Sequence, residues 1–394
     1  MNQLDHWLLP DGVEDLLPPT AGKLEAARQT LIRVFSSWGF DYVMPPKLEF
    51  IDSLLTGTGK DLDLQTIKVI DQLSGRLMGL PADITPQVAR IDAHSLPSEG
   101  VNRLCYAGSV VRSRPEGFVG ARVPIKAGAE LFGDRSIHAD FEIMSLMISS
   151  LHSLGLDDIH VELGDVSVYR TLIEQAALDA SVSGEIFGLI QKKARHALVQ
   201  LTKARVADPV LAGRINALPE LCGSASVLDD AECLFASDSV ALSAVERLRA
   251  LIERLASRFP SLTLSIDLSE LRGFSYHTGV GFAAYHSGSG RLMARGGRYD
   301  NVGELFGRAR PATGFDIELS SLLDQLPSTG REETNPLVVV DAVEQPTKTI
   351  ESALWEKVAM LRSEGYRVIE GESAGKEAPK RLQFDGTQWV LQDR

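Results

Sequence analysis

An apolar face that recurs at three- and four-residue steps runs through residues 24–38 and predicts an amphipathic helix. Thr20 is placed to act as the N-cap, and Gly39 stands just past the end, where a left-handed residue commonly terminates a helix. Residues 40–44 then read as a short strand, which two prolines stop. The helix face consists of Leu24, Ala27, Leu31, Phe35 and Trp38.

Residues 102–132 are expected to form an antiparallel strand pair whose arms join in a loop with two glycines and a proline. Side chains alternate between the two faces of a strand, so Arg112 belongs to one face of the first arm. Lys126 and Glu130 share one face of the second arm. One side of the pair is therefore charged, and a helix over residues 136–154 is expected to pack behind it.

Residues 168–258 differ in character from the rest of the chain, because they are rich in Ala and Leu and mostly helical in pattern. Helices are expected over residues 184–204 and 240–257. Strand patterns at residues 159–163 and 262–268 stand on both sides. The pattern is typical of a helical insertion into a sheet domain.

After the insertion the sheet resumes, with a hairpin around residues 287–290 and an amphipathic run over residues 313–326. Residues 1–326 are thus expected to form the main domain. Residues 327–336 read as a polar linker, and residues 337–394 as a small α/β domain with a strand–helix–strand pattern. The predicted fold class is α+β: an antiparallel sheet flanked by helices, with a helical insertion and a small C-terminal α/β domain.

Length and composition limit the number of domains and the classes of function that the chain can have. A chain of 394 residues suggests two or three domains. With 40 basic and 53 acidic residues the net charge is −13, which disfavours nucleic acid as a partner. No stretch reaches the roughly 20 apolar residues that cross a membrane, and no secretory signal is visible. Cys105, Cys222 and Cys233 lack metal-ligand spacing and read as reduced thiols of a cytoplasmic protein without a metal site.

Five short motifs occur in an order that resembles the catalytic domain of class II aminoacyl-tRNA synthetases, and more narrowly the histidyl-tRNA synthetase type. The resemblance covers about residues 10–325 and implies a self-dimer through residues 20–46. The motifs are LPADIT at 80–85, YAG at 106–108 leading to Arg112, ELFG at 130–133, LRGFSY at 271–276 and GGRYD at 296–300.

The resemblance also identifies what an ATP site would need. The family places one arginine in its second motif, matched here by Arg112, and another on the helix of its third motif, where this chain has Ser321. Serine carries no charge and cannot replace a guanidinium at a triphosphate. The carboxylate that the family uses to read adenine is also missing from residues 113–115. We therefore expect no aminoacyl-adenylate formation, no catalytic residues and no cofactor.

The amino-acid pocket of the family is matched more closely. By resemblance, Glu130 accepts the imidazole N–H of histidine, and Tyr276 with His277 stands where the family has an aromatic pair. Asp83 and Thr85 match the residues that hold the α-ammonium.

Two further positions complete the resemblance. Arg272 matches the residue that meets the carboxylate. Lys126 replaces a glutamine, and its charge would repel a ligand ammonium unless Asp83 neutralises it. The predicted histidine-binding set is Asp83, Thr85, Arg112, Lys126, Glu130, Arg272, Tyr276 and His277.

Each of these residues also has a structural interpretation. Glu130 and Arg112 could form a cross-strand ion pair on a solvated sheet face. Arg272 could be a turn residue, His277 a structural histidine and Tyr276 part of the core.

The combination of a retained amino-acid pocket and a lost ATP site resembles a group of synthetase paralogues, the regulatory subunits of ATP phosphoribosyltransferase. The short C-terminal piece, which has no basic stripe, agrees with that group. The resemblance implies a hetero-oligomer with the short-form catalytic subunit, activation of that subunit and feedback inhibition by histidine. A divergent histidyl-tRNA synthetase, a stand-alone histidine sensor and a tRNA-binding paralogue remain as alternatives.

Overall fold

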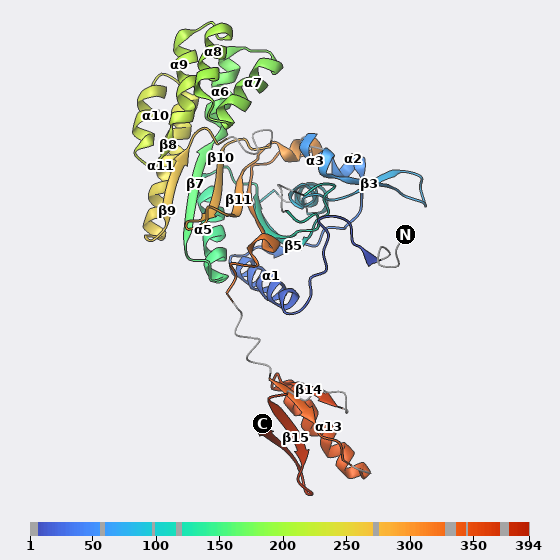
Figure 1. Cartoon of the computed structure of the whole chain (residues 1–394). Coiled ribbons are helices and arrows are strands. Elements are labelled where there is room, and N and C mark those ends of the chain that lie inside the picture. Colours follow the sequence, from blue (N-terminus) through green and yellow to red (C-terminus); the bar gives the residue numbers. More distant parts are fainter. Residues whose placement is uncertain are drawn as a thin grey trace. The chain divides into compact units, whose positions relative to one another are not determined.

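The computed structural model divides into two compact units, Met1–Leu326 and Pro327–Arg394, which are described separately (Figure 1). Among the described residues, no helix is both long and apolar enough to cross a membrane. The structure describes residues 7–55, 60–96, 99–115, 120–270, 276–327, 336–343, 346–370 and 378–393.

The first unit is built on a mixed, mainly antiparallel sheet, to which nine of the described strands belong. Only the pairs β1–β5 and β7–β9 are parallel in that sheet as described. The predicted α+β class is therefore confirmed. In spatial order the strands are β1 (Asp41–Tyr42), β5 (Asn102–Ser109), β6 (Ile125–Phe132), β12 (Ala312–Glu318), β11 (Leu292–Arg298), β10 (Val280–His286), β7 (Ile159–Asp165), β9 (Thr263–Asp267) and β8 (Cys222–Gly223).

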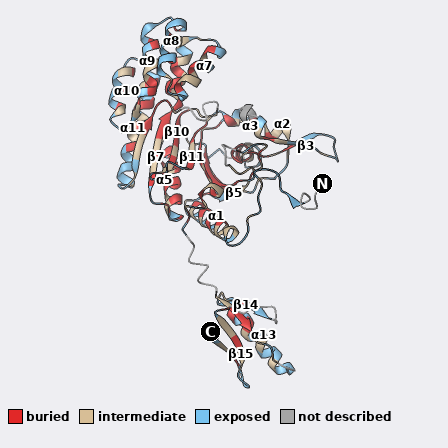
Figure 2. Ribbon diagram, in the orientation of Figure 1, coloured by how far each residue is buried: buried red, intermediate tan, exposed pale blue. Residues whose placement is uncertain are grey.

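Helices α1 (Thr20–Ser37) and α5 (Ile137–Ser153) pack on the apolar face of this sheet, and both were predicted. Figure 2 shows this core as a buried layer of helix and strand residues. Thr20 is not the N-cap, because the helix begins at Thr20 itself and Pro19 precedes it without a capping side chain. Gly39 has the expected left-handed backbone, with φ of 82°.

Strand β11 is tied to α5 by a buried ion pair. The Arg298 guanidinium donates to both carboxylate oxygens of Asp140 at 3.1 Å and to the Asp134 carbonyl oxygen at 3.1 Å. The side chains of Arg298 and Asp140 are only 8% and 1% exposed. The pair fixes the glycine-rich end of β11, which borders the site described below.

The insertion between β7 and β9 is helical, as the sequence predicted. The run expected to be one helix over residues 184–204 is two helices, because Lys193 adopts a left-handed φ of 50° and breaks the hydrogen-bond ladder. Asp238 caps the longest helix by accepting from the Val240 and Ala241 amides. The helices are α6 (Val166–Ala176), α7 (Ala180–Gln191), α8 (Arg195–Arg205), α9 (Pro209–Ala217), α10 (Val227–Phe235) and α11 (Ser239–Arg258), with a 3-10 turn at Leu218–Glu220.

A small three-stranded sheet lies in the sequence between β1 and β5 of the main sheet and leads into the site. Its last strand in sequence is followed by Asp83 and by helix α4, which begins at Thr85. The predicted run over residues 313–326 proved to be strand β12 followed by a 3-10 turn. These elements are β2 (Glu49–Phe50), α2 (Ile51–Leu54), α3 (Lys60–Gln65), β3 (Ile67–Ile70), β4 (Leu77–Leu80), α4 (Thr85–Arg90), a π-helical turn (Ile91–Ser95) and 3-10 turns at Val302–Phe306 and Leu319–Leu322.

The second unit contains the expected parallel strand–helix–strand piece, since β13 and β14 pair in parallel on either side of α13 in the sequence. A further antiparallel hairpin, β15–β16, completes its sheet and was not predicted. Its strands are rich in Lys, Arg, Gln and Asp, so their alternation is weak without the neighbouring strand. The elements are β13 (Leu337–Val340), α13 (Lys348–Ser363), β14 (Arg367–Glu370), β15 (Lys380–Phe384) and β16 (Trp389–Asp393).

Candidate functional site

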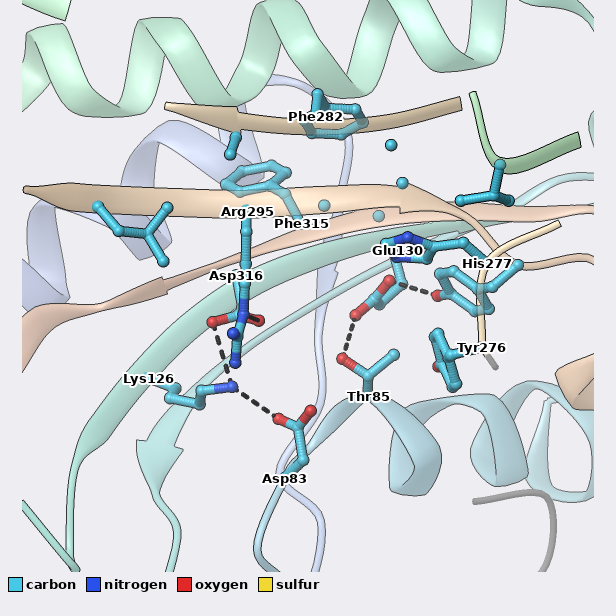
Figure 3. Close-up of a pocket in the computed structure, with 18 of the residues that line it drawn as sticks. Asp83, Thr85, Lys126, Glu130, Tyr276, His277, Phe282, Arg295, Phe315 and Asp316 are labelled. Carbon is cyan, nitrogen blue, oxygen red and sulfur yellow. Dashed lines mark hydrogen bonds and ion pairs between the residues drawn. The ribbon is translucent and has the colours of Figure 1, made fainter. Parts of the chain in front are cut away.

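A cavity of about 350 Å³ opens on the face of the main sheet that α1 and α5 leave uncovered. Its walls come from the central strands and from the segment that joins β4 to α4 (Figure 3). The structure brings seven of the eight predicted residues to this cavity, and Arg272 lies outside the described residues. The seven are Asp83, Thr85, Arg112, Lys126, Glu130, Tyr276 and His277.

Glycines keep part of the cavity wall free of side chains. A Cβ on Gly314 would collide with the Glu130 carboxylate, and one on Gly296 would collide with the Gly314 carbonyl oxygen. A Cβ on Gly297 would lie 2.9 Å from the His277 ring. Any larger residue at these positions would therefore displace a site group or the neighbouring strand.

One end of the cavity is organised around the carboxyl group of Glu130, which is 1% exposed. Thr85 Oγ1 donates to Glu130 Oε1 at 2.8 Å, and Tyr299 donates its hydroxyl to Oε2. Tyr106 lies 3.4 Å from Oε1. Burial raises the pKa of Glu130 to about 8, although the hydrogen bonds from Tyr299 and Thr85 oppose that rise. Glu130 therefore holds a proton over much of the neutral range.

Tyr276 and His277 lie beside Glu130 (Figure 3). The ring of Tyr276 stacks on Tyr299 with centroids 4.9 Å apart. Burial, with a further contribution from Arg295, lowers the pKa of His277 to about 4, so its imidazole is neutral. Within the part of the chain that the structure describes, the Tyr276 hydroxyl and His277 Nδ1 are buried polar atoms without a hydrogen-bond partner. Such atoms in a cavity are suited to a polar ligand.

The other end of the cavity is charged. The Lys126 ammonium lies 2.9 Å from Asp83 Oδ1 and 3.1 Å from Asp316 Oδ1, and its side chain is 1% exposed. Arg295 Nε lies 3.9 Å from Asp316 Oδ2. Burial alone would lower the pKa of Lys126, but the carboxylates of Asp316 and Asp83 outweigh it and raise that pKa. Asp83 and Asp316 thus both neutralise Lys126.

Arg112 and Glu130 do not form the cross-strand ion pair that was one interpretation of the sequence. Arg112 is 2% exposed and its Nη2 lies 3.2 Å from Glu318 Oε2. Ser321, at the position of the family's second arginine, donates its hydroxyl to the Glu318 carbonyl oxygen at 2.7 Å. The chain therefore has serine where the family has its second arginine. Its first arginine, Arg112, is paired with the Glu318 carboxylate.

Tyr299, Arg295 and Asp316 belong to the site but were not predicted as site residues. Tyr299 lies in the motif GGRYD and could have been found as the only hydroxyl-bearing side chain of that motif. Asp316 is a partner of Lys126 only because β12 lies beside β6. Among the described residues, no group of three or more His, Cys, Asp or Glu side chains could hold a metal ion.

The family model for histidyl-tRNA synthetase matches residues 12–322. The chain is 48% identical over 371 residues to an ATP phosphoribosyltransferase regulatory subunit from Pseudomonas fluorescens (strain Pf0-1), covering 94% of this chain and 92% of the relative. It is 46% identical over 399 residues to the regulatory subunit of the same name from Pseudomonas syringae pv. tomato, covering 99% of each.

Two solved structures share the fold. One is an ATP phosphoribosyltransferase regulatory subunit/histidyl-tRNA synthetase from Bacillus halodurans C, with a TM-score of 0.81, 25% identity and 95% of both chains covered. The other is the ATP phosphoribosyl transferase (HisG:HisZ) complex from Thermotoga maritima, with a TM-score of 0.58 and 20% identity. That match covers 77% of this chain and 98% of the matched chain.

Proposed function

The chain belongs to the family of ATP phosphoribosyltransferase regulatory subunits, and on that premise we propose how it regulates. Its role in histidine biosynthesis is regulatory and not catalytic. It associates with the short-form catalytic subunit in a hetero-oligomer, raises the turnover of that subunit and transmits feedback inhibition by histidine. We place this assembly in the cytoplasm.

The observation that carries the histidine assignment is the Glu130 end of the cavity. A buried carboxyl group held by two hydroxyls can accept an imidazole N–H through an oxygen lone pair that those hydroxyls leave free. The Tyr276 hydroxyl and His277 Nδ1 are the further polar atoms that a ligand ring can engage. Arg272 is proposed to contact the ligand carboxylate, and Thr85 to contact its ammonium.

Feedback requires that histidine bind two states of the assembly with different affinity, because equal affinity shifts no equilibrium. Coupling free energies of about 1–3 kcal/mol are typical of such systems and correspond to roughly 5- to 150-fold changes in affinity. We propose that histidine favours the less active state of the hetero-oligomer through the cavity.

A self-dimer through residues 20–46 is part of the proposal. Strand β1 is the edge strand of the main sheet as described, and an unpaired edge is a surface for association. Exposed apolar side chains lie on and beside it: Tyr42 is 38% exposed and Met44 79% exposed. A covering partner would remove both from water.

Titration calorimetry of the full chain with histidine tests the ligand assignment. We expect binding in the wild type and a loss of tenfold or more in Glu130→Gln, while Glu253→Gln, an exposed change on α11, serves as the matched control. Equal affinity in wild type and Glu130→Gln would refute the imidazole contact.

Mixing the chain with the short-form catalytic subunit tests the regulatory role. We expect complex formation, higher turnover of the catalytic subunit and inhibition by histidine. Neither complex nor rate change at micromolar concentration would favour a stand-alone sensor. A divergent synthetase would instead give pyrophosphate exchange with histidine and ATP, which we do not expect because Glu318 neutralises Arg112 and residue 321 is uncharged.

A further inference from the structure

The charged end of the cavity is neutralised from within the chain. The Lys126 ammonium is held by two carboxylates, Asp83 Oδ1 at 2.9 Å and Asp316 Oδ1 at 3.1 Å. Arg295 adds a second cation beside Asp316. The charged end of the cavity therefore holds two cations and two carboxylates without a ligand. The Lys126 ammonium is bound there as the ammonium of a ligand would be.

The two carboxylates remain open to the cavity although the lysine is not. The side chain of Asp83 is 27% exposed and that of Asp316 is 15% exposed, whereas Lys126 is 1% exposed. Both acids line the cavity, so a ligand can reach them. A lysine that served only to hold strands together would not need its partners on a cavity wall.

A ligand ammonium entering this cavity has to find a carboxylate, because a buried charge is costly unless it is paired. Asp83 and Asp316 already hold Lys126, and Glu130 is held by hydroxyls. Glu162 and Glu270 line the cavity as well, but each has interactions of its own. A second ammonium must therefore displace Lys126 or lie close to it, and like charges a few ångströms apart repel.

We propose that Lys126 is a specificity-determining residue that takes the place of a ligand ammonium, so that the cavity favours imidazole ligands without an ammonium over histidine. Lys126 thereby weakens histidine binding and raises the concentration at which histidine acts. The proposal rests on the proposed imidazole contact at Glu130, while the discrimination arises at the opposite end of the cavity (Figure 3).

The experiment compares two probes by calorimetry on the full chain. Histidine and imidazole-4-propionate share the ring and the carboxylate, and only histidine has the ammonium. We expect the wild type to bind imidazole-4-propionate at least tenfold more tightly. Lys126→Gln should shift the ratio of the two dissociation constants towards histidine by tenfold or more, because Asp83 then becomes available to its ammonium.

A second variant keeps the test meaningful if Lys126→Gln does not fold, since removing one partner of a buried ion pair is strongly destabilising. The double variant Lys126→Gln with Asp316→Asn removes one charge of each sign and leaves Asp83 for the ligand. It should show the same shift. Lys203→Gln, an exposed change on α8, is the matched control and should leave the ratio unchanged.

The outcomes separate this proposal from the one on which it rests. A ratio that does not change in the folded Lys126 variants, a wild type that prefers histidine tenfold or more, or no binding of either probe would each overturn the role of Lys126. If Glu130→Gln binds both probes like the wild type but the ratio still responds to Lys126, the imidazole contact is wrong and the discrimination stands.

Discussion

Replacing Glu130 by glutamine should remove a loss of stability that the wild type undergoes as the pH rises. The pKa of Glu130 is raised from 4.5 to about 8 by burial. A carboxyl group with a higher pKa in the folded chain binds more protons there than in the unfolded chain between those two values. Its ionisation therefore costs nothing below pH 4.5 and destabilises the fold progressively up to about pH 8.

The magnitude follows from 1.36 kcal/mol per pH unit for one proton. Between pH 5.5 and 7.5 the wild type should lose about 3 kcal/mol relative to Glu130→Gln, whose amide has no charge to bury. For a chain of this size the difference corresponds to roughly 5 °C in Tm. Tyr299 and Thr85 can hydrogen-bond to either side chain, so the comparison isolates the charge.

Thermal unfolding of both proteins followed by circular dichroism at pH 5.5, 6.5 and 7.5, without ligand, measures this effect. Glu253→Gln controls for the loss of a surface carboxylate. As the pH rises, the Tm of Glu130→Gln should increase relative to the Tm of the wild type. Two parallel curves would mean that Glu130 is ionised throughout this range, which would contradict the argument from burial.

Three further changes have expected outcomes. Arg298→Leu leaves the buried Asp140 carboxylate unpaired and should lower the free energy of unfolding by about 3–5 kcal/mol, measured by denaturant titration; a change under 1 kcal/mol would refute it. Gly314→Ala should displace the Glu130 carboxylate and weaken histidine binding tenfold or more by calorimetry, whereas Gly188→Ala, whose Cβ meets nothing within 4 Å, should not. Because burial raises the pKa of Cys105 to about 12, a thiol reagent at pH 8 should label at most two cysteines in the folded chain and three after denaturation; three fast thiols would contradict this.

Local patterns predicted the elements that depend on neighbours in the sequence. The apolar positions of α1 include Leu31 and Phe35, which are 0% exposed, and their spacing alone places them on one face. The β5–β6 pair could be predicted because its two arms alternate and follow one another in the sequence. In the insertion, the left-handed Lys193 carries no sequence signal of its own, so two helices were read as one.

The contacts of the site depend on strands that are distant in the sequence. Lys126 meets Asp316 because β12 pairs with β6, with Glu318 directly opposite Lys126 in the register. Arg112 meets Glu318 for the same reason. The residue types at the cavity could be predicted through resemblance. The pairing of each cation with its carboxylate depends on the order of the strands in the sheet, and that order cannot be read from a single sequence.

The position of β12 in the sheet has a consequence during synthesis. Phe132 at the end of β6 pairs with Ala312, so β6 leaves the ribosome long before its second neighbour exists. At about 5–20 residues per second, roughly 10–40 s pass before β12 follows. Throughout that interval the edge of β6 that β12 later covers exposes unpaired amides and carbonyls. The nascent chain is therefore most open to aggregation while its helical insertion is being translated.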